Sequence, residues 1–104
     1  MKRVAFKMYL KEGKKEEYRR RHRELWPGVA ELLKKAGVAE YSIFLDEQSS
    51  VLFAVQTITS GEGSQSLGNN SIIREWWDYM SDIMEVNDDH SPVSVELEEL
   101  FYLP

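Results

Sequence analysis

The sequence predicts an α+β fold in which two helices cover one face of a four-stranded antiparallel sheet. Three observations carry this prediction: segments of period-two apolar alternation, two segments with the helical apolar period, and one short polar linker that joins two strands as a hairpin. A chain of 104 residues suits a single domain, residues 1–104, with one core.

A change of apolar period marks the first strand and the first helix. Residues 4–10 alternate with period two, which predicts a strand with one face on the core. Residues 14–36 place their apolar side chains in one arc at the helical step, which predicts an amphipathic helix. Pro27 lies inside this stretch and predicts either a kink near Leu25 or two abutting helical pieces.

A hairpin, a loop and a second helix follow. Residues 41–45 and 51–58 are rich in β-branched and aromatic side chains, which predicts two antiparallel strands. Glycines and serines in residues 59–71 predict a mobile loop. Residues 72–84 then show the helical period, with Asn70 or Ser71 as the cap.

The last segment, residues 93–103, predicts a final strand interrupted by acidic residues. The resulting order, β-α-β-β-α-β, is the ferredoxin-like arrangement. Because two helices cover only one face of such a sheet, we expect a second copy of the chain to cover the other, giving a homodimer in the form of a dimeric α/β barrel.

Composition excludes several classes of function. The chain has 13 Lys and Arg against 18 Asp and Glu, a net charge of −5 that disfavours nucleic-acid and membrane partners. It has no cysteine, which excludes disulfide frameworks and thiol nucleophiles. The longest aliphatic and aromatic run, residues 51–55, is too short to span a bilayer, and no signal peptide is predicted, so we expect a cytoplasmic protein.

His22 is the most informative position for function. It projects inside the apolar arc of the first predicted helix, one turn after Tyr18. An inward imidazole is either a core histidine with one partner or a general acid or base in a cavity between helix and sheet. Tyr18 is either a core aromatic or a group that positions a hydroxyl substrate. His22 and His90 match no metal-ligand spacing, so no metal is predicted.

Aromatic side chains offer further candidates. Trp76 and Trp77 are adjacent, so we expect Trp76 to face the core and Trp77 to face a cleft or a partner. Large flat rings suit either the apolar faces of sugars or an interface. Tyr41 opens the second strand, where ordinary sheet packing is the alternative to a binding role. The arginines at 19, 20, 21 and 23 have glutamates nearby and predict a solvated helix face.

Several segments carry a resemblance to a known family. They are YRRRH and LWP within residues 18–27, YSIFLD at 41–46, WWDYM at 76–80, SPVS at 91–94 and the ending LFYLP. Together these segments resemble the L-rhamnose mutarotases, small cofactor-free sugar 1-epimerases of ferredoxin-like fold that form dimers. The resemblance covers nearly the whole chain.

The resemblance implies that His22 is the proton donor and that Tyr18, Tyr41, Trp76 and Trp77 contact the sugar. It also implies interconversion of the α and β anomers of L-rhamnose without a cofactor, for a downstream isomerase of rhamnose catabolism that accepts one anomer. An imidazole that gives and takes a proton near neutral pH suits the opening and closing of a sugar ring.

Two other functions fit the same fold. A non-catalytic dimeric α/β-barrel module that binds a small ligand would explain the tryptophans equally well, but it gains nothing from an inward His22 beside Tyr18. A cofactor-free oxygenase of the same architecture would depend on the reactivity of its own substrate.

Overall fold

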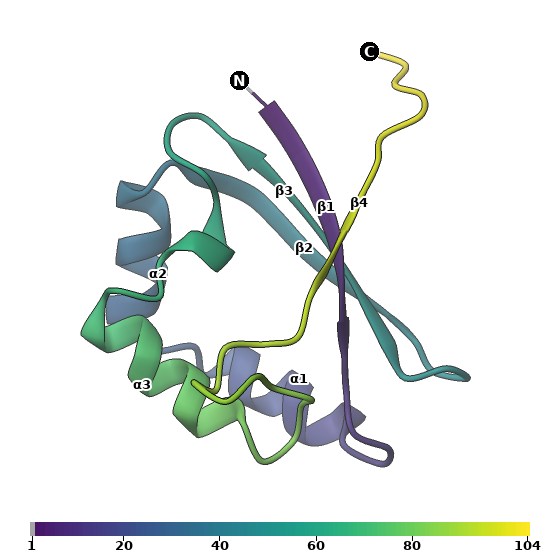
Figure 1. The fold of residues 1–104 in the computed structure, drawn as a ribbon, viewed down its shortest axis with the longest axis vertical. Coiled ribbons are helices and arrows are strands. Elements are labelled where there is room, and N and C mark those ends of the chain that lie inside the picture. The colour runs from purple at the N-terminus through teal and green to yellow at the C-terminus, as the bar shows by residue number, and fades with distance from the viewer. Residues whose placement is uncertain (1) are drawn as a thin grey trace.

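The computed structural model describes residues 2–104, and its three α-helices lie on one face of a four-stranded antiparallel sheet (Figure 1). The elements in chain order are β1 (Lys2–Tyr9), α1 (Lys15–Arg23), α2 (Pro27–Lys35), β2 (Val38–Asp46), β3 (Val51–Ile58), a 3-10 turn η1 (Ser64–Ser66), α3 (Ser71–Met80) and β4 (Val95–Leu97). This architecture confirms the predicted ferredoxin-like α+β fold. Within residues 2–104, none of the helices combines the length and hydrophobicity that a bilayer span requires.

The strand order β2-β3-β1-β4 places β1 and β3 at the centre of the sheet. β1 pairs with β3 along its whole length, from Lys2 opposite Ile58 to Tyr9 opposite Val51. β4 pairs with β1 through three residues only. The two central strands therefore form the rigid platform on which the helices pack.

The first predicted helix is divided into α1 and α2. Of the two alternatives predicted from Pro27, a kink or two helical pieces, the structure has the second. Trp26, the residue before the proline, is extended, with φ −60° and ψ 129°, because the ring of a following proline disfavours helical geometry. Pro27 itself occupies the first turn of α2, where its missing N–H costs no hydrogen bond.

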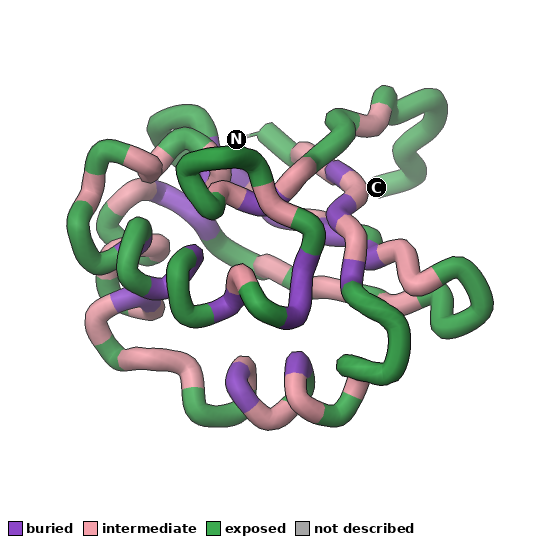
Figure 2. The backbone as a smooth tube through the Cα atoms, turned by 60° about the horizontal axis from the view of Figure 1, so that its bottom comes forward, coloured by how far each residue is buried: buried purple, intermediate pink, exposed green. Residues whose placement is uncertain are grey.

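The core lies between the helices and the sheet (Figure 2). β1 contributes Phe6 and Met8, and β3 contributes Leu52 and Ala54, on the face that the helices cover. Complementary apolar side chains come from the helix layer and the turn after α3: Tyr18, Val29, Ile73, Trp76, Trp77, Met80, Ile83 and Met84. The prediction that residues 4–10 turn one face toward the core is thus confirmed, since Phe6, Met8 and Leu10 are buried there.

The opposite face of the sheet carries a row of side chains that none of the helices in residues 2–104 covers. Val95 pairs with Lys7, Lys7 with Phe53, and Phe53 with Phe44, so these four residues lie side by side across the sheet. Phe44 is 63% exposed and Phe53 is 36% exposed. We call the surface formed by these four residues the outer sheet face.

Two predicted boundaries are wrong at the C-terminal side of the chain. α3 ends at Met80 rather than continuing to residue 84, because residues 81–83 form a turn in which the Ser81 hydroxyl donates to the carbonyl of Asp78. Ile83 and Met84 keep the apolar pattern because they remain in the core outside the helix. The predicted strand over residues 93–103 shrinks to β4, and Phe101 after it is 79% exposed.

Candidate active site

A cavity of about 840 Å³ lies between the helix layer and the inner face of the sheet. Its walls come from α1, α2, α3 and the inner faces of β1, β2 and β3. The structure brings all five predicted site residues to this one cavity: Tyr18, His22, Tyr41, Trp76 and Trp77. These positions are far apart in the sequence, so the fold rather than local spacing assembles them.

His22 is half-buried on α1 and lines the cavity. Its Nδ1 lies 3.0 Å from the carbonyl oxygen of Tyr18. Since a carbonyl oxygen can only accept, Nδ1 carries the hydrogen, and the lone pair of the neutral ring is on Nε2. Burial lowers the pKa of His22 below its ordinary value of 6.5, although the bond to the Tyr18 carbonyl opposes this shift. The imidazole is therefore mainly neutral at pH 7.

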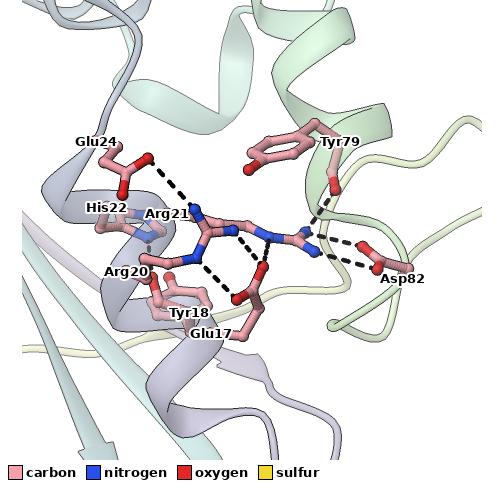
Figure 3. Close-up of polar contacts among 8 residues, drawn as sticks. All are labelled: Glu17, Tyr18, Arg20, Arg21, His22, Glu24, Tyr79 and Asp82. Atoms are coloured by element: carbon pink, nitrogen blue, oxygen red, sulfur yellow. Dashed lines mark hydrogen bonds and ion pairs between the residues drawn. The ribbon is translucent and has the colours of Figure 1, made fainter.

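Aromatic rings fix the imidazole on two sides. The Tyr18 ring stacks on His22 with centroids 4.3 Å apart and an interplanar angle of 28°. The Trp76 ring meets His22 edge-on, with centroids 5.6 Å apart and an angle of 88°. The predicted one-turn relation of Tyr18 and His22 is thus a direct ring contact (Figure 3). Because Trp76 belongs to α3, the orientation of the imidazole depends on both α1 and α3.

Tyr18 and Tyr41 bring two phenols to the cavity from opposite layers, α1 and β2. Burial raises the pKa of each, and an unfavourable charge interaction with Tyr41 raises the pKa of Tyr18 further. Both phenols are consequently protonated at neutral pH and can donate hydrogen bonds. Tyr41 lies within an irregularity of β2 between Ala39 and Ser42, and Glu40, directly before it, has φ 48°.

Trp76 and Trp77 both line the cavity, and each is 8% exposed. Trp77 is therefore a wall of the cavity within its own chain. Gly68 packs directly against Trp77, because a Cβ at position 68 would lie only 3.0 Å from the Trp77 ring. The segment between β3 and α3 thus approaches the indole as closely as a glycine permits.

That segment, predicted as a mobile loop, is anchored in the structure by a buried pair of hydrogen bonds. The Gln56 side chain donates from Nε2 to the Ser64 hydroxyl over 2.8 Å, and the Ser64 N–H donates to Gln56 Oε1 over 2.9 Å. Both residues are buried. No pattern in the sequence indicates this anchor, since a glutamine on an apolar strand face and a serine in a loop each have many ordinary roles.

Charged side chains also line the cavity, at Lys15, Arg19, Arg23, Lys34 and Glu40. Arg19 forms an exposed ion pair with Glu16 over 3.4 Å, and Lys15 forms one with Glu47 over 3.2 Å. These groups supply hydrogen-bond donors and one carboxylate at the edge of an otherwise aromatic and aliphatic site. The arrangement suits a small polar molecule with an apolar face.

Arg21 corrects the prediction that the arginines of α1 form a solvated face. It is 7% exposed and reaches out of α1 to Asp82 and to the carbonyl oxygen of Tyr79 (Figure 3). Its position three residues after Tyr18 places it next to the inner side of the helix, but the sequence does not show the partner, Asp82, that accompanies its burial. Arg19, Arg20 and Arg23 are not buried, as predicted.

Comparisons with known proteins extend over the same elements. The family model described as L-rhamnose mutarotase matches residues 3–103. An L-rhamnose mutarotase of Formosa agariphila is 55% identical over 103 residues, and one of Bacteroides thetaiotaomicron is 54% identical, each alignment covering 99% of both chains. A crystal structure of an L-rhamnose mutarotase from Formosa agariphila superposes with a TM-score of 0.91 at 51% identity, covering all of both chains. The similarity therefore includes every element that lines the cavity.

Proposed function

The chain belongs to the L-rhamnose mutarotase family, and we propose that it interconverts the α and β anomers of L-rhamnose in the cavity described above, with His22 carrying the proton. The observation that supports this role is the orientation of His22. Its Nδ1 is held by the Tyr18 carbonyl, which leaves Nε2 as the nitrogen that can exchange a proton with a bound sugar.

The reaction moves one proton from the anomeric hydroxyl to the ring oxygen. Nε2 of neutral His22 accepts the anomeric proton, the bond between C1 and the ring oxygen breaks, and the resulting imidazolium donates a proton to that oxygen. Both oxygens are bonded to C1, so one nitrogen can serve each in turn. The product is the open-chain aldehyde. Rotation about the C1–C2 bond and reversal of the same steps close the ring on the other face.

The aromatic residues hold the sugar for this transfer. The Tyr18 and Tyr41 phenols, which their burial keeps protonated, donate hydrogen bonds to sugar oxygens. Trp76 and Trp77 offer flat apolar walls for the methyl group and C–H faces of a 6-deoxy sugar. Because the tautomer and the rings are in place before the sugar binds, little reorganisation accompanies the reaction.

The direct test of this function is saturation-transfer NMR of anomer exchange on freshly dissolved sugars, with and without the protein. We expect L-rhamnose to exchange fastest, L-mannose more slowly by up to about 10²-fold, and D-glucose scarcely at all. An apolar wall rejects an added hydroxyl only modestly, whereas misplaced ring hydroxyls lose several hydrogen bonds.

Equal rates on L-rhamnose and D-glucose would contradict this account of the cavity. Binding of L-rhamnose with no acceleration of exchange would instead identify a ligand-binding module, the alternative that the fold also allows.

The assembly that we propose is a homodimer formed through the outer sheet face. Phe44 and Phe53 lie side by side there and are exposed, and Val95 is exposed beyond Lys7. Exposed apolar side chains gathered on one sheet face are costly to leave in water. Leu100 and Phe101, after β4, add two further exposed apolar side chains. A second copy of the chain would cover this surface through a two-fold axis.

Light scattering is expected to give a mass near 24 kDa, twice the 12.1 kDa of one chain. Phe53→Lys should shift this mass toward the monomer, because it replaces one of the two adjacent phenylalanines of the outer sheet face by a second charge beside Lys7. Ile72→Lys is the matched control, since Ile72 is exposed to the same degree, 37% against 36%, but lies on α3. A folded parent protein that is monomeric at micromolar concentration would contradict the proposal.

A further inference from the structure

Arg21 is a buried charge, and all three nitrogens of its guanidinium donate hydrogen bonds to the protein. Its Nε donates to Glu17 Oε2 over 2.8 Å, and its two terminal nitrogens donate to the Asp82 carboxylate over 2.8 and 3.2 Å. Nη1 also donates to the Tyr79 carbonyl over 2.7 Å. Guanidinium and carboxylate groups in this two-pronged geometry form short, directional bonds. A buried charge held in this way fixes the distance and the angle between the elements that it joins.

The elements that Arg21 joins are the two helices that hold the His22 site. Tyr79 and Asp82 lie in the last turn of α3 and just beyond it, where carbonyl groups carry partial negative charge. The guanidinium thus binds the C-terminal end of α3 from the side of α1. α1 buries only two side chains, Tyr18 and Arg21. Because one of its two buried side chains is a charged arginine, α1 is attached to the end of α3 largely through the hydrogen bonds of Arg21.

A chain of ring contacts leads from this bridge to the imidazole. The Arg21 guanidinium lies over the Tyr79 ring, 4.5 Å from its centroid. The Tyr79 ring packs on Trp76 with centroids 5.6 Å apart, and the Trp76 ring meets His22 edge-on at the same separation. Arg21 also precedes His22 directly in α1. A rotation of α1 that released Arg21 would swing His22 away from Trp76.

We propose that Arg21 is a positioning residue, which acts through Asp82 and Tyr79 to hold His22 at the angle that proton transfer requires. The role rests on the proposed function of His22. Arg21 does not line the cavity, so its contribution comes from orientation alone. An error of about 1 Å in the position of a reacting group can cost about 10²-fold in rate.

The test is Arg21→Lys in the full chain, with Arg20→Lys as the matched control. Lysine keeps the charge but cannot reproduce the two-pronged contact with Asp82. Arg20 also pairs with Glu17, and its other partners are Glu24, directly after α1, and the side chain of Tyr79. Its ion-pair partners do not include Asp82, so it lacks the two-pronged contact that Arg21 makes beyond the end of α3. We expect Arg21→Lys to lower kcat for L-rhamnose about 10-fold or more, with a much smaller change in KM, and Arg20→Lys to keep both within about twofold.

A purely structural role would lower the melting temperature while leaving kcat of the folded protein unchanged. Activity is therefore measured well below the melting temperature, and folding is checked by circular dichroism. If Arg21→Lys does not fold, Asp82→Asn takes its place, because it keeps the shape of the partner and removes its charge. A folded variant with parental kcat overturns the proposal.

An NMR titration of His22 gives a second measurement that does not require turnover. If the imidazole leaves its buried position in the variant, its pKa should rise toward 6.5, because burial is what lowers it. If the parent protein fails to exchange L-rhamnose anomers, the proposed function is wrong, and this titration alone decides whether Arg21 positions His22. An unchanged His22 pKa would then overturn the positioning role.

Discussion

Replacing His22 by alanine is expected to lower the rate of L-rhamnose anomer exchange about 10²- to 10⁴-fold, the usual contribution of a general acid or base. The substitution removes the nitrogen that accepts and returns the proton. It leaves the Tyr18 and Trp76 rings that surround the imidazole. Since His22 is only half-buried, we expect the variant to remain folded.

The pH dependence of the parent protein ties this loss to the imidazole itself. The neutral ring accepts the first proton, so kcat/KM should be constant near pH 7 to 8 and fall on the acid side, with a midpoint below 6.5, because burial lowers the pKa of His22. His22→Ala should lack this acid limb.

His90→Ala is the control for a general effect of removing a histidine. His90 lies in an exposed turn and pairs with Asp78 over 2.8 Å, so its removal should leave exchange unchanged. Exchange by His22→Ala within a few-fold of the parent, measured by saturation transfer after subtraction of the spontaneous reaction, would show that His22 does not carry the proton.

The largest expected effect on stability comes from Gly37→Ala, at the turn that joins α2 to β2. Gly37 has φ +88°, a conformation that costs an alanine about 1 to 2 kcal/mol. A Cβ there would also lie 2.5 Å from the carbonyl oxygen and 2.6 Å from the nitrogen of Ser60. Because these are backbone atoms, relief requires a shift of the chain that adds about 1 to 3 kcal/mol. The free energy of unfolding should fall by about 2 to 5 kcal/mol.

Gly13→Ala separates the two causes. Gly13 has φ +79°, but no atom lies within 4 Å of the Cβ that alanine would add, so only the conformational cost of about 1 to 2 kcal/mol applies. Urea unfolding of both variants at one protein concentration measures the difference. Equal destabilisation of the two variants would show that the turn at Gly37 relaxes without cost.

The elements that the sequence predicted well are those whose pattern has a single physical cause. Pro27 broke the first helical segment because its ring excludes helical geometry at Trp26. The strand near the N-terminus showed the alternation of a half-buried sheet, and residues 51–58 showed the β-branched and aromatic composition of a strand. In the structure these two segments pair as β1 and β3. Helical period also placed Tyr18 and His22 on one face, and their rings stack.

The features that the sequence predicted badly are those that depend on a distant partner. The period of residues 72–84 continued past Met80 because Ile83 and Met84 stay in the core while the backbone turns. Arg21 looked like its neighbours Arg20 and Arg23, and only the fold places Asp82 within its reach. Likewise, residues 59–71 looked like a mobile loop, and only the fold places Ser64 against the side chain of Gln56.

The order of strands in the sheet affects how the chain can fold while it is being synthesised. β1 is synthesised before both of the strands that flank it, β3 and β4. At about 5 to 20 residues per second, roughly 2 to 10 seconds separate the synthesis of Tyr9 from that of Ile58. Until β3 is synthesised, the amides of β1 have no strand partner on either edge, and Phe6 and Met8 lack the Leu52 and Ala54 that share their core. Until β3 is in place, the open edges of β1 are therefore where a nascent chain can pair with another chain instead.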